Sequence, residues 1–157
     1  MRKGESVMPT LAISEAKNKL TSLRREALTG KEIILDDAKR KDDGPVSLIS
    51  TALLDELCSG KVFTYEWADE PGNGQENYSL WNHETGVYGV GSTKDEAIED
   101  YIDNIIDYAN VYYSDLPYYL SHSGNTYNHY WYLRRVVRCN GDRQKLYQIL
   151  NLESLTE

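Results

Sequence analysis

No run of 18 or more apolar residues occurs in the sequence, so no segment has the composition of a membrane-spanning helix. The N-terminus carries two basic residues without an apolar stretch behind them, which argues against a secretory signal peptide. The two cysteines, Cys58 and Cys139, lack a metal-ligand spacing, and we expect them to be reduced thiols in a cytoplasmic protein. The sequence leaves a disulfide between them open.

Patterns for catalysis and cofactor binding are also missing. No Ser/His/Asp or Cys/His arrangement supports a nucleophile, and no close metal spacing joins the candidate ligands His83, His122, His129 and Cys139. The glycine-rich segment 86–94 resembles a phosphate-binding loop only superficially, because Ser92 stands where such a loop has lysine. Asp95 and Glu96, which follow, would repel phosphate. We therefore expect a protein that is not an enzyme and that holds no metal or cofactor.

Charge is distributed unevenly along the chain, whose net charge is −8. Residues 1–60 carry ten Lys/Arg and ten Asp/Glu, whereas residues 61–157 carry seven Lys/Arg and fifteen Asp/Glu, so the whole excess of negative charge lies in the second segment. Such a division is expected if the two halves meet different partners. An acidic half can equally serve solubility.

The first half has the periodicities of a small α+β domain. Residues 10–13 are an expected strand, and Ser14 is an expected helix N-cap. An apolar helix face follows at spacings of four, three and four: Ala16, Leu20, Leu23 and Ala27. Gly30 is placed to end this helix in the left-handed conformation. Further strands at 32–35 and 46–50, on either side of the charged turn 36–44, and a short helix at 51–58 complete a domain that we expect to end at residue 60.

The second half, 61–157, predicts an antiparallel sheet followed by helices. Strands are expected at 61–67, 78–82 and 86–90, with a loop at 69–77. Thr93 and Glu96 form a capping-box pattern at the start of a helix over 94–113. Its apolar face consists of Ala97, Ile98, Tyr101, Ile102, Ile105, Tyr108, Ala109 and Tyr112. A last helix from Tyr130 is expected to be interrupted at Asn140-Gly141 and to resume over 142–152.

The ordered elements of residues 8–58 resemble the Phd/YefM (prevent-host-death) antitoxins. The resemblance rests on the strand and helix start Thr10-Leu11-Ala12-Ile13-Ser14-Glu15-Ala16-Lys17, on Gly44-Pro45-Val46-Ser47-Leu48-Ile49-Ser50, and on Leu53-Leu54-Asp55-Glu56-Leu57. It implies a homodimer, or a higher homo-oligomer, whose N-terminal strands and helices lie on operator DNA. The expected fold is therefore α+β, with a small Phd-like domain of a three-stranded sheet and helices before the antiparallel-sheet domain.

By position, Lys17 stands where the family has a basic residue that contacts DNA. Other residues expected near the same surface are Arg2, Lys3, Ser14, Asn18, Lys19, Lys39 and Arg40. Lysine and arginine contact phosphates, and serine and asparagine can bond phosphates or base edges. The sequence departs from the family where Asp36-Asp37 replace Thr-Arg, although the basic run 39–41 can supply charge from another position. The alternative is a dimerisation unit that has lost DNA binding.

Residues 62–113 resemble the HicB-type antitoxin domain, in which a glycine-containing turn precedes a Thr-x-Glu-Glu-Ala helix start. We expect the second half to bind a protein partner through acidic and tyrosine side chains: Glu99, Asp100, Asp103, Asp107, Tyr112, Tyr118 and Tyr119. A basic RNase-like toxin would fit such a surface. The alternative for the acids is a solvated helix face, with Arg134, Arg135 and Arg138 expected to pair with it.

These observations predict an antitoxin-like transcriptional autorepressor with no membrane partner. The first domain, 1–60, would dimerise and bind operator DNA, and the second, 61–157, would neutralise a toxin. The alternative is a Phd-like dimeric protein- or ligand-binding module without DNA binding.

Overall fold

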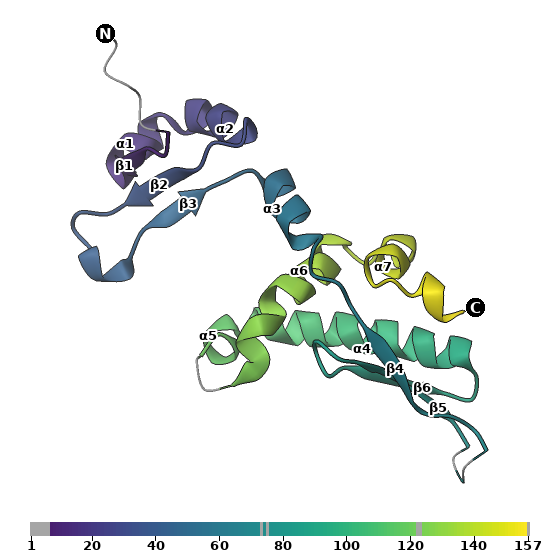
Figure 1. Ribbon diagram of the computed structural model, residues 1–157. Coiled ribbons are helices and arrows are strands. Elements are labelled where there is room, and N and C mark those ends of the chain that lie inside the picture. Colours follow the sequence, from purple (N-terminus) through teal and green to yellow (C-terminus); the bar gives the residue numbers. More distant parts are fainter. Residues whose placement is uncertain (1–6, 73, 75, 122–123, 157) are drawn as a thin grey trace. The chain divides into compact units, whose positions relative to one another are not determined.

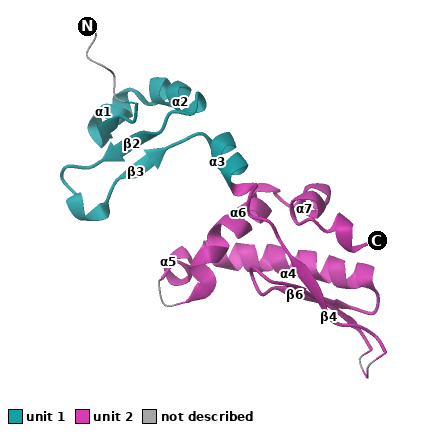
Figure 2. Ribbon diagram, in the orientation of Figure 1, with its two compact units in different colours: residues 1–57 teal, residues 58–157 magenta. Residues whose placement is uncertain are grey.

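The computed structural model describes residues 7–72, 74, 76–121 and 124–156. The chain divides into two compact units, residues 1–57 and residues 58–157 (Figure 2). Each unit has its own three-stranded sheet and its own hydrophobic core, so the chain is of the α+β class, as predicted. Within the described residues, no helix is long and apolar enough to cross a membrane.

Unit 1 is a mixed sheet with helices (Figure 1). Its elements, in order, are β1 (Thr10–Ala12), α1 (Ile13–Asn18), α2 (Leu20–Leu28), β2 (Ile33–Asp36), a 3-10 turn (Lys41–Asp43), β3 (Val46–Leu48) and α3 (Thr51–Cys58), which runs into unit 2. The strand order is β1-β2-β3, with β1 and β2 parallel and β2 and β3 antiparallel. The buried core is small and consists of Ala16, Leu23, Ala27 and Ile33.

The start of the first helix differs from its prediction. Ser14 is not the N-cap, because β1 runs directly into α1 and the extended residue Ala12 takes the cap position without a side-chain hydrogen bond. The helix is also interrupted at Lys19, whose backbone (φ −116°, ψ 12°) separates α1 from α2. Leu20 is therefore 59% exposed rather than part of the buried face. Gly30 does adopt the predicted left-handed conformation, with φ +96°.

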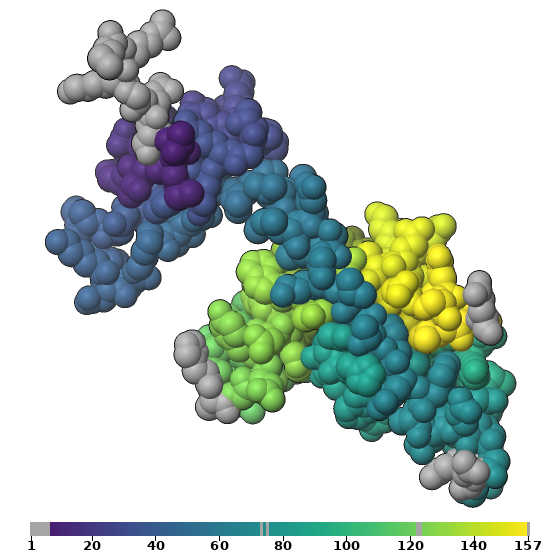
Figure 3. All heavy atoms as spheres, viewed as in Figure 1, coloured from purple at the N-terminus to yellow at the C-terminus, as the bar shows by residue number. Residues whose placement is uncertain are grey.

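Unit 2 begins with an antiparallel sheet of order β4-β5-β6. Its elements are β4 (Tyr65–Asp69), β5 (Tyr78–Asn82), β6 (Tyr88–Gly91), α4 (Lys94–Ser114), α5 (Leu116–Tyr119), a 3-10 turn (Asn125–His129), α6 (Tyr130–Arg138), α7 (Arg143–Ile149) and a last 3-10 turn (Glu153–Leu155). The sequence predicted these elements except α5 and the 3-10 turns, and it placed the start of β4 at residue 61. The C-terminal residues (yellow) pack against the rest of this unit (Figure 3).

The long helix α4 holds unit 2 together. The Thr93 half of the predicted capping box is present, because the Thr93 hydroxyl accepts a hydrogen bond from the Glu96 N–H at 3.1 Å. The Glu96 carboxylate in turn accepts one from the Ser92 N–H at 2.9 Å. The predicted apolar face is confirmed, since all its members but the partly exposed Tyr108 are buried. One face of the sheet packs on α4 at Gly89 and Gly91, where a Cβ atom would lie 2.3 and 2.4 Å from helix backbone atoms.

Candidate functional sites in the two units

The predicted DNA-contacting residues of unit 1 are exposed where the structure describes them. Ser14, Lys17 and Asn18 lie on α1. Lys17 has no hydrogen bond or ion pair through its side chain within the described residues. Lys19 follows α1 and its ammonium lies 2.9 Å from the Glu15 carboxylate, an exposed pair that water screens strongly. The cationic group left uncompensated on α1 is therefore Lys17.

The other basic residues predicted to contact DNA do not lie on α1. Lys39 and Arg40 are exposed in the turn between β2 and β3, separate from α1 in sequence. Arg2 and Lys3 lie outside the described residues. The structure therefore describes two groups of exposed polar and basic side chains, one on α1 and one in the turn.

Asp36 and Asp37 have different surroundings. Asp36 is the last residue of β2 and pairs in register with Ala12, the residue before α1. The register thus places Asp36 at the end of the strand pair where α1 begins. A carboxylate at this position would repel a phosphate group. The Asp37 side chain bonds within the turn that follows β2, where its Oδ1 accepts a hydrogen bond from the Lys39 N–H at 2.9 Å.

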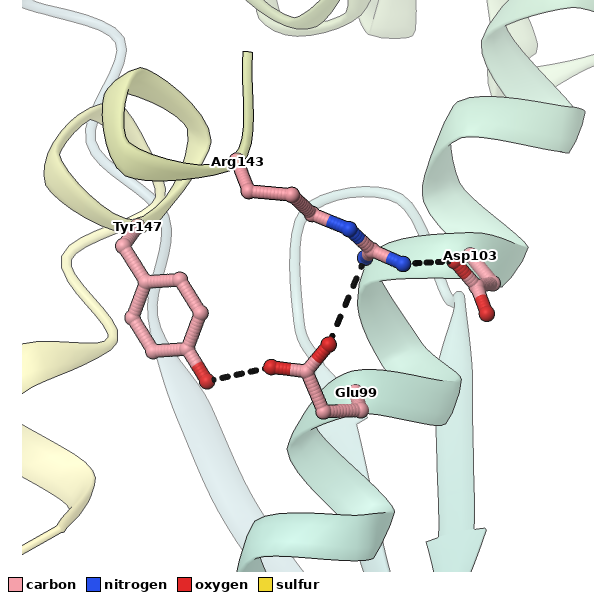
Figure 4. A network of polar contacts seen from close by, with 4 residues as sticks. All are labelled: Glu99, Asp103, Arg143 and Tyr147. Atoms are coloured by element: carbon pink, nitrogen blue, oxygen red, sulfur yellow. Dashed lines mark hydrogen bonds and ion pairs between the residues drawn. The ribbon is translucent and has the colours of Figure 1, made fainter. Parts of the chain in front are cut away.

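In unit 2, two of the predicted partner-binding acids form internal ion pairs (Figure 4). Arg143 on α7 lies 3.6 Å from the Glu99 carboxylate and 2.6 Å from that of Asp103. The Tyr147 hydroxyl donates a hydrogen bond to Glu99 at 2.8 Å. Burial, and then this bond to Glu99, raises the pKa of Tyr147 to about 12. These contacts connect α7 to α4, so Glu99 and Asp103 share one arginine within the chain.

A third predicted acid, Asp100, protects the edge of the sheet. Its Oδ2 accepts a hydrogen bond from the Val90 N–H at 2.8 Å, on the strand β6 that ends the strand order. Asn104, one turn further along α4, donates to the Tyr88 carbonyl at 2.9 Å and to Asp100 at 3.2 Å. Unpaired groups on an edge strand invite pairing with another chain, and these side chains occupy two of them.

The predicted tyrosines divide between core and surface. Tyr112 is completely buried, which corrects its placement on a partner surface. It lies on the apolar face of α4, and its hydroxyl donates to the Thr126 carbonyl at 2.7 Å. Tyr119 stacks on it with ring centroids 4.7 Å apart and is half-buried. Tyr118 is 67% exposed, so it is the one member of this predicted trio with a largely free ring.

A neutral aromatic pair holds the 3-10 turn of residues 125–129 on α4. The Tyr108 hydroxyl lies 2.7 Å from Nδ1 of His129. Burial raises the pKa of Tyr108 to about 12 and lowers the pKa of His129, so both groups are uncharged near neutral pH. Where the structure describes the chain, no three His, Cys, Asp or Glu side chains gather to hold a metal, and His122 lies outside that part.

The acidic helix forms ion pairs with an arginine that was not predicted, Arg143. Arg135 donates a hydrogen bond to the Lys61 carbonyl at 2.6 Å, and Arg143 supplies the ion pairs to α4. Sequence reasoning missed both Arg143 and Tyr147. The available signal was their i, i+4 spacing, which places both on one face of α7.

Asp107 is the predicted acid that stays uncompensated. It is exposed on α4, and its carboxylate makes no hydrogen bond or ion pair with any residue that the structure describes. Among the predicted site residues on α1 and α4, each helix therefore has one exposed charged side chain without a hydrogen bond or ion pair in the described part of the chain, Lys17 in unit 1 and Asp107 in unit 2.

Comparison with known proteins defines the class. The family model that matches residues 8–151 is PHD-like, described as the antitoxin of a RelE/RelB toxin–antitoxin system. Because the match spans most of both units, the chain belongs to this PHD-like antitoxin family. It is accordingly an antitoxin of a toxin–antitoxin system, and a regulatory protein rather than an enzyme.

A solved structure shows the same fold. It is described as an antitoxin part of a candidate toxin/antitoxin system of Syntrophomonas wolfei subsp. wolfei. The similarity has a TM-score of 0.66 at 16% sequence identity and covers 82% of this chain and 86% of that one. No curated protein matches the sequence.

Proposed function

We propose that this antitoxin represses its own operon, with unit 1 as a Phd/YefM-like dimer on operator DNA and unit 2, HicB-like in its sheet and helix, as the toxin-binding part. The observation that carries the DNA role is the exposed and unpaired Lys17 beside Ser14 and Asn18 on α1. The division of charge supports the assignment of roles. Unit 1 has ten Lys/Arg and ten Asp/Glu, whereas unit 2 has seven and fifteen and is suited to a basic partner such as an RNase toxin. Both activities belong to the cytoplasm.

The composition of unit 1 supports dimerisation. A unit of fewer than about 70 residues rarely buries enough apolar surface to be stable alone. This one has four buried core side chains. It leaves large apolar side chains half exposed or more: Ile13, Leu20, Leu28 and Val46. A second copy that covers part of this surface would supply the missing burial.

Replacing Lys17 by alanine is expected to weaken binding to the protein's own promoter fragment. Loss of one phosphate contact reduces the slope of log affinity against log salt concentration by about one. Fluorescence anisotropy titrations at several salt concentrations measure both quantities. The matched control is Lys145→Ala, which removes an exposed cation of unit 2 and is expected to leave DNA affinity unchanged. Equal affinity and equal slope for Lys17→Ala would refute its role.

The second candidate function is a dimeric binding module without DNA affinity. The observation that favours it is Asp36, whose carboxylate is placed by strand register at the start of α1. The same titrations decide between the two functions. Binding of the wild-type chain to its promoter fragment at low salt supports the repressor. The absence of binding supports the dimeric binding module without DNA affinity.

A further inference from the structure

A groove in unit 2 lies between α4 and α6. It has a volume of about 290 Å³ and is lined by Ile106, Ala109, Asn110, Val136, Val137, Asn140 and Gly141. Val136 is buried and Val137 is 44% exposed, so the second valine offers an apolar wall. Gly141, with φ +77° and no atom within 4 Å of its Cβ position, leaves one end of the groove open.

The rim of this groove carries polar groups without partners. Asn110 and Asn140 are exposed, and neither carboxamide has a hydrogen bond among the described residues. Asp107 lies three positions before Asn110 on α4, a spacing that makes them neighbours on the helix surface. One turn before Asp107, Asp103 is held by Arg143. The groove therefore combines an apolar floor with two free carboxamides, and one free carboxylate lies next to it on the surface of α4.

This combination selects a cationic side chain with an aliphatic stem. Arginine and lysine bury their methylene groups on apolar surface and keep the charged end among polar groups. A guanidinium has five N–H donors and no acceptor, which matches the two carboxamide oxygens on the rim and the neighbouring Asp107 carboxylate. An acidic residue would be repelled by Asp107, and a purely apolar residue would leave the rim desolvated and unpaired.

We propose that the α4–α6 groove receives a basic side chain of the toxin, with arginine the best fit, and that Asp107 pairs with it. The inference rests on the proposed toxin-binding role of unit 2. Charge complementarity supports this occupant, since residues 58–157 carry seven Lys/Arg against fifteen Asp/Glu. The proposal also assigns different roles to neighbouring acids: Asp103 and Glu99 bind α7 through Arg143, and Asp107 contacts the partner.

The test uses the full chain and the product of the reading frame next to its gene, with binding measured by calorimetry. Asp107→Lys is expected to raise the dissociation constant at least ~tenfold, because it places a cation opposite the incoming one. Asp115→Lys is the matched control. Asp115 is also exposed, its carboxylate has no partner within the described residues, and the substitution changes the net charge equally. It is expected to change the constant by less than about twofold.

The outcomes separate the inference from the function on which it rests. Loss of affinity confined to Asp107→Lys supports the groove. Equal losses of affinity in both variants would mean that long-range charge attraction is responsible. Unchanged affinity of Asp107→Lys would mean that the partner protein binds elsewhere. Either result overturns the inference about the groove and leaves the toxin-binding role intact. If Asp107→Lys instead changes the oligomeric state of the chain, a second copy occupies the groove, and the inference that a toxin side chain does so is overturned. Failure of the wild-type chain to bind its neighbour overturns the toxin-binding role as well.

Discussion

Replacing Gly89 by alanine is expected to destabilise unit 2 by about 3 kcal/mol or more. A Cβ atom at this position would lie 2.3 Å from the Ala97 carbonyl oxygen and from the Tyr101 backbone nitrogen. These are backbone atoms of α4, so no side-chain rotation relieves the overlap, and the helix must leave the sheet. For a unit of this size, such a loss lowers the melting temperature by at least about 12 °C. Thermal unfolding followed by circular dichroism measures the shift.

Gly124→Ala provides the control for this prediction. Gly124 has an extended backbone (φ −152°), and a Cβ atom there would meet Thr126 Oγ1 at an ordinary 3.7 Å. We expect its melting temperature to stay within about 2 °C of the wild type, as for other surface substitutions. A Gly89→Ala protein as stable as Gly124→Ala would show that α4 does not pack on β6 at this distance.

Replacing Asn82 by aspartate is expected to destabilise the same unit by about 3 kcal/mol at neutral pH. Asn82 is fully buried. Its Nδ2 donates to the Thr64 carbonyl at 3.0 Å and to the Glu84 carboxylate at 2.7 Å, and its Oδ1 accepts from the Thr85 N–H and hydroxyl. The substitution replaces the donating Nδ2 with an oxygen of the new carboxylate, which then faces two hydrogen-bond acceptors, the Thr64 carbonyl and the Glu84 carboxylate. Urea unfolding at neutral pH gives the change in the free energy of unfolding.

The pH dependence of this variant tests its cause. A protonated aspartate can donate a hydrogen bond, so the deficit relative to the wild type is expected to shrink on acidification. Asn77→Asp, at an exposed position, is the matched control and is expected to have nearly wild-type stability. A deficit for Asn82→Asp that does not change with pH would argue against charge repulsion as the reason.

Local sequence patterns predicted the elements whose cause is itself local. The Thr93 side-chain cap and the apolar face of α4 depend on contacts within a few turns of one helix, and both are present. The predicted cap at Ser14 was wrong because the end of β1 occupies the cap position. A propensity at one residue does not include the strand register that fixes where the helix begins.

The functional surfaces were less predictable because they depend on distant residues. Arg143 meets Asp103 from 40 positions along the chain, and this contact removes Asp103 from the set of free acids. Asp36 reaches the start of α1 only through the parallel pairing of β1 and β2. The sequence showed an acidic helix face, and within the described residues the fold leaves Asp107 as the one predicted partner-binding acid without an ion pair or hydrogen bond, next to a groove.

The most direct test of the antitoxin role is growth of cells that express the protein encoded beside this gene, with and without the full chain. We predict that the neighbour alone arrests growth and that co-expression restores it, with the two proteins recovered as one complex. The Lys17→Ala variant is expected to restore growth as well as the wild type, because DNA binding and toxin binding are assigned to different units. A neighbour that remains toxic in the presence of the wild-type chain would contradict the account.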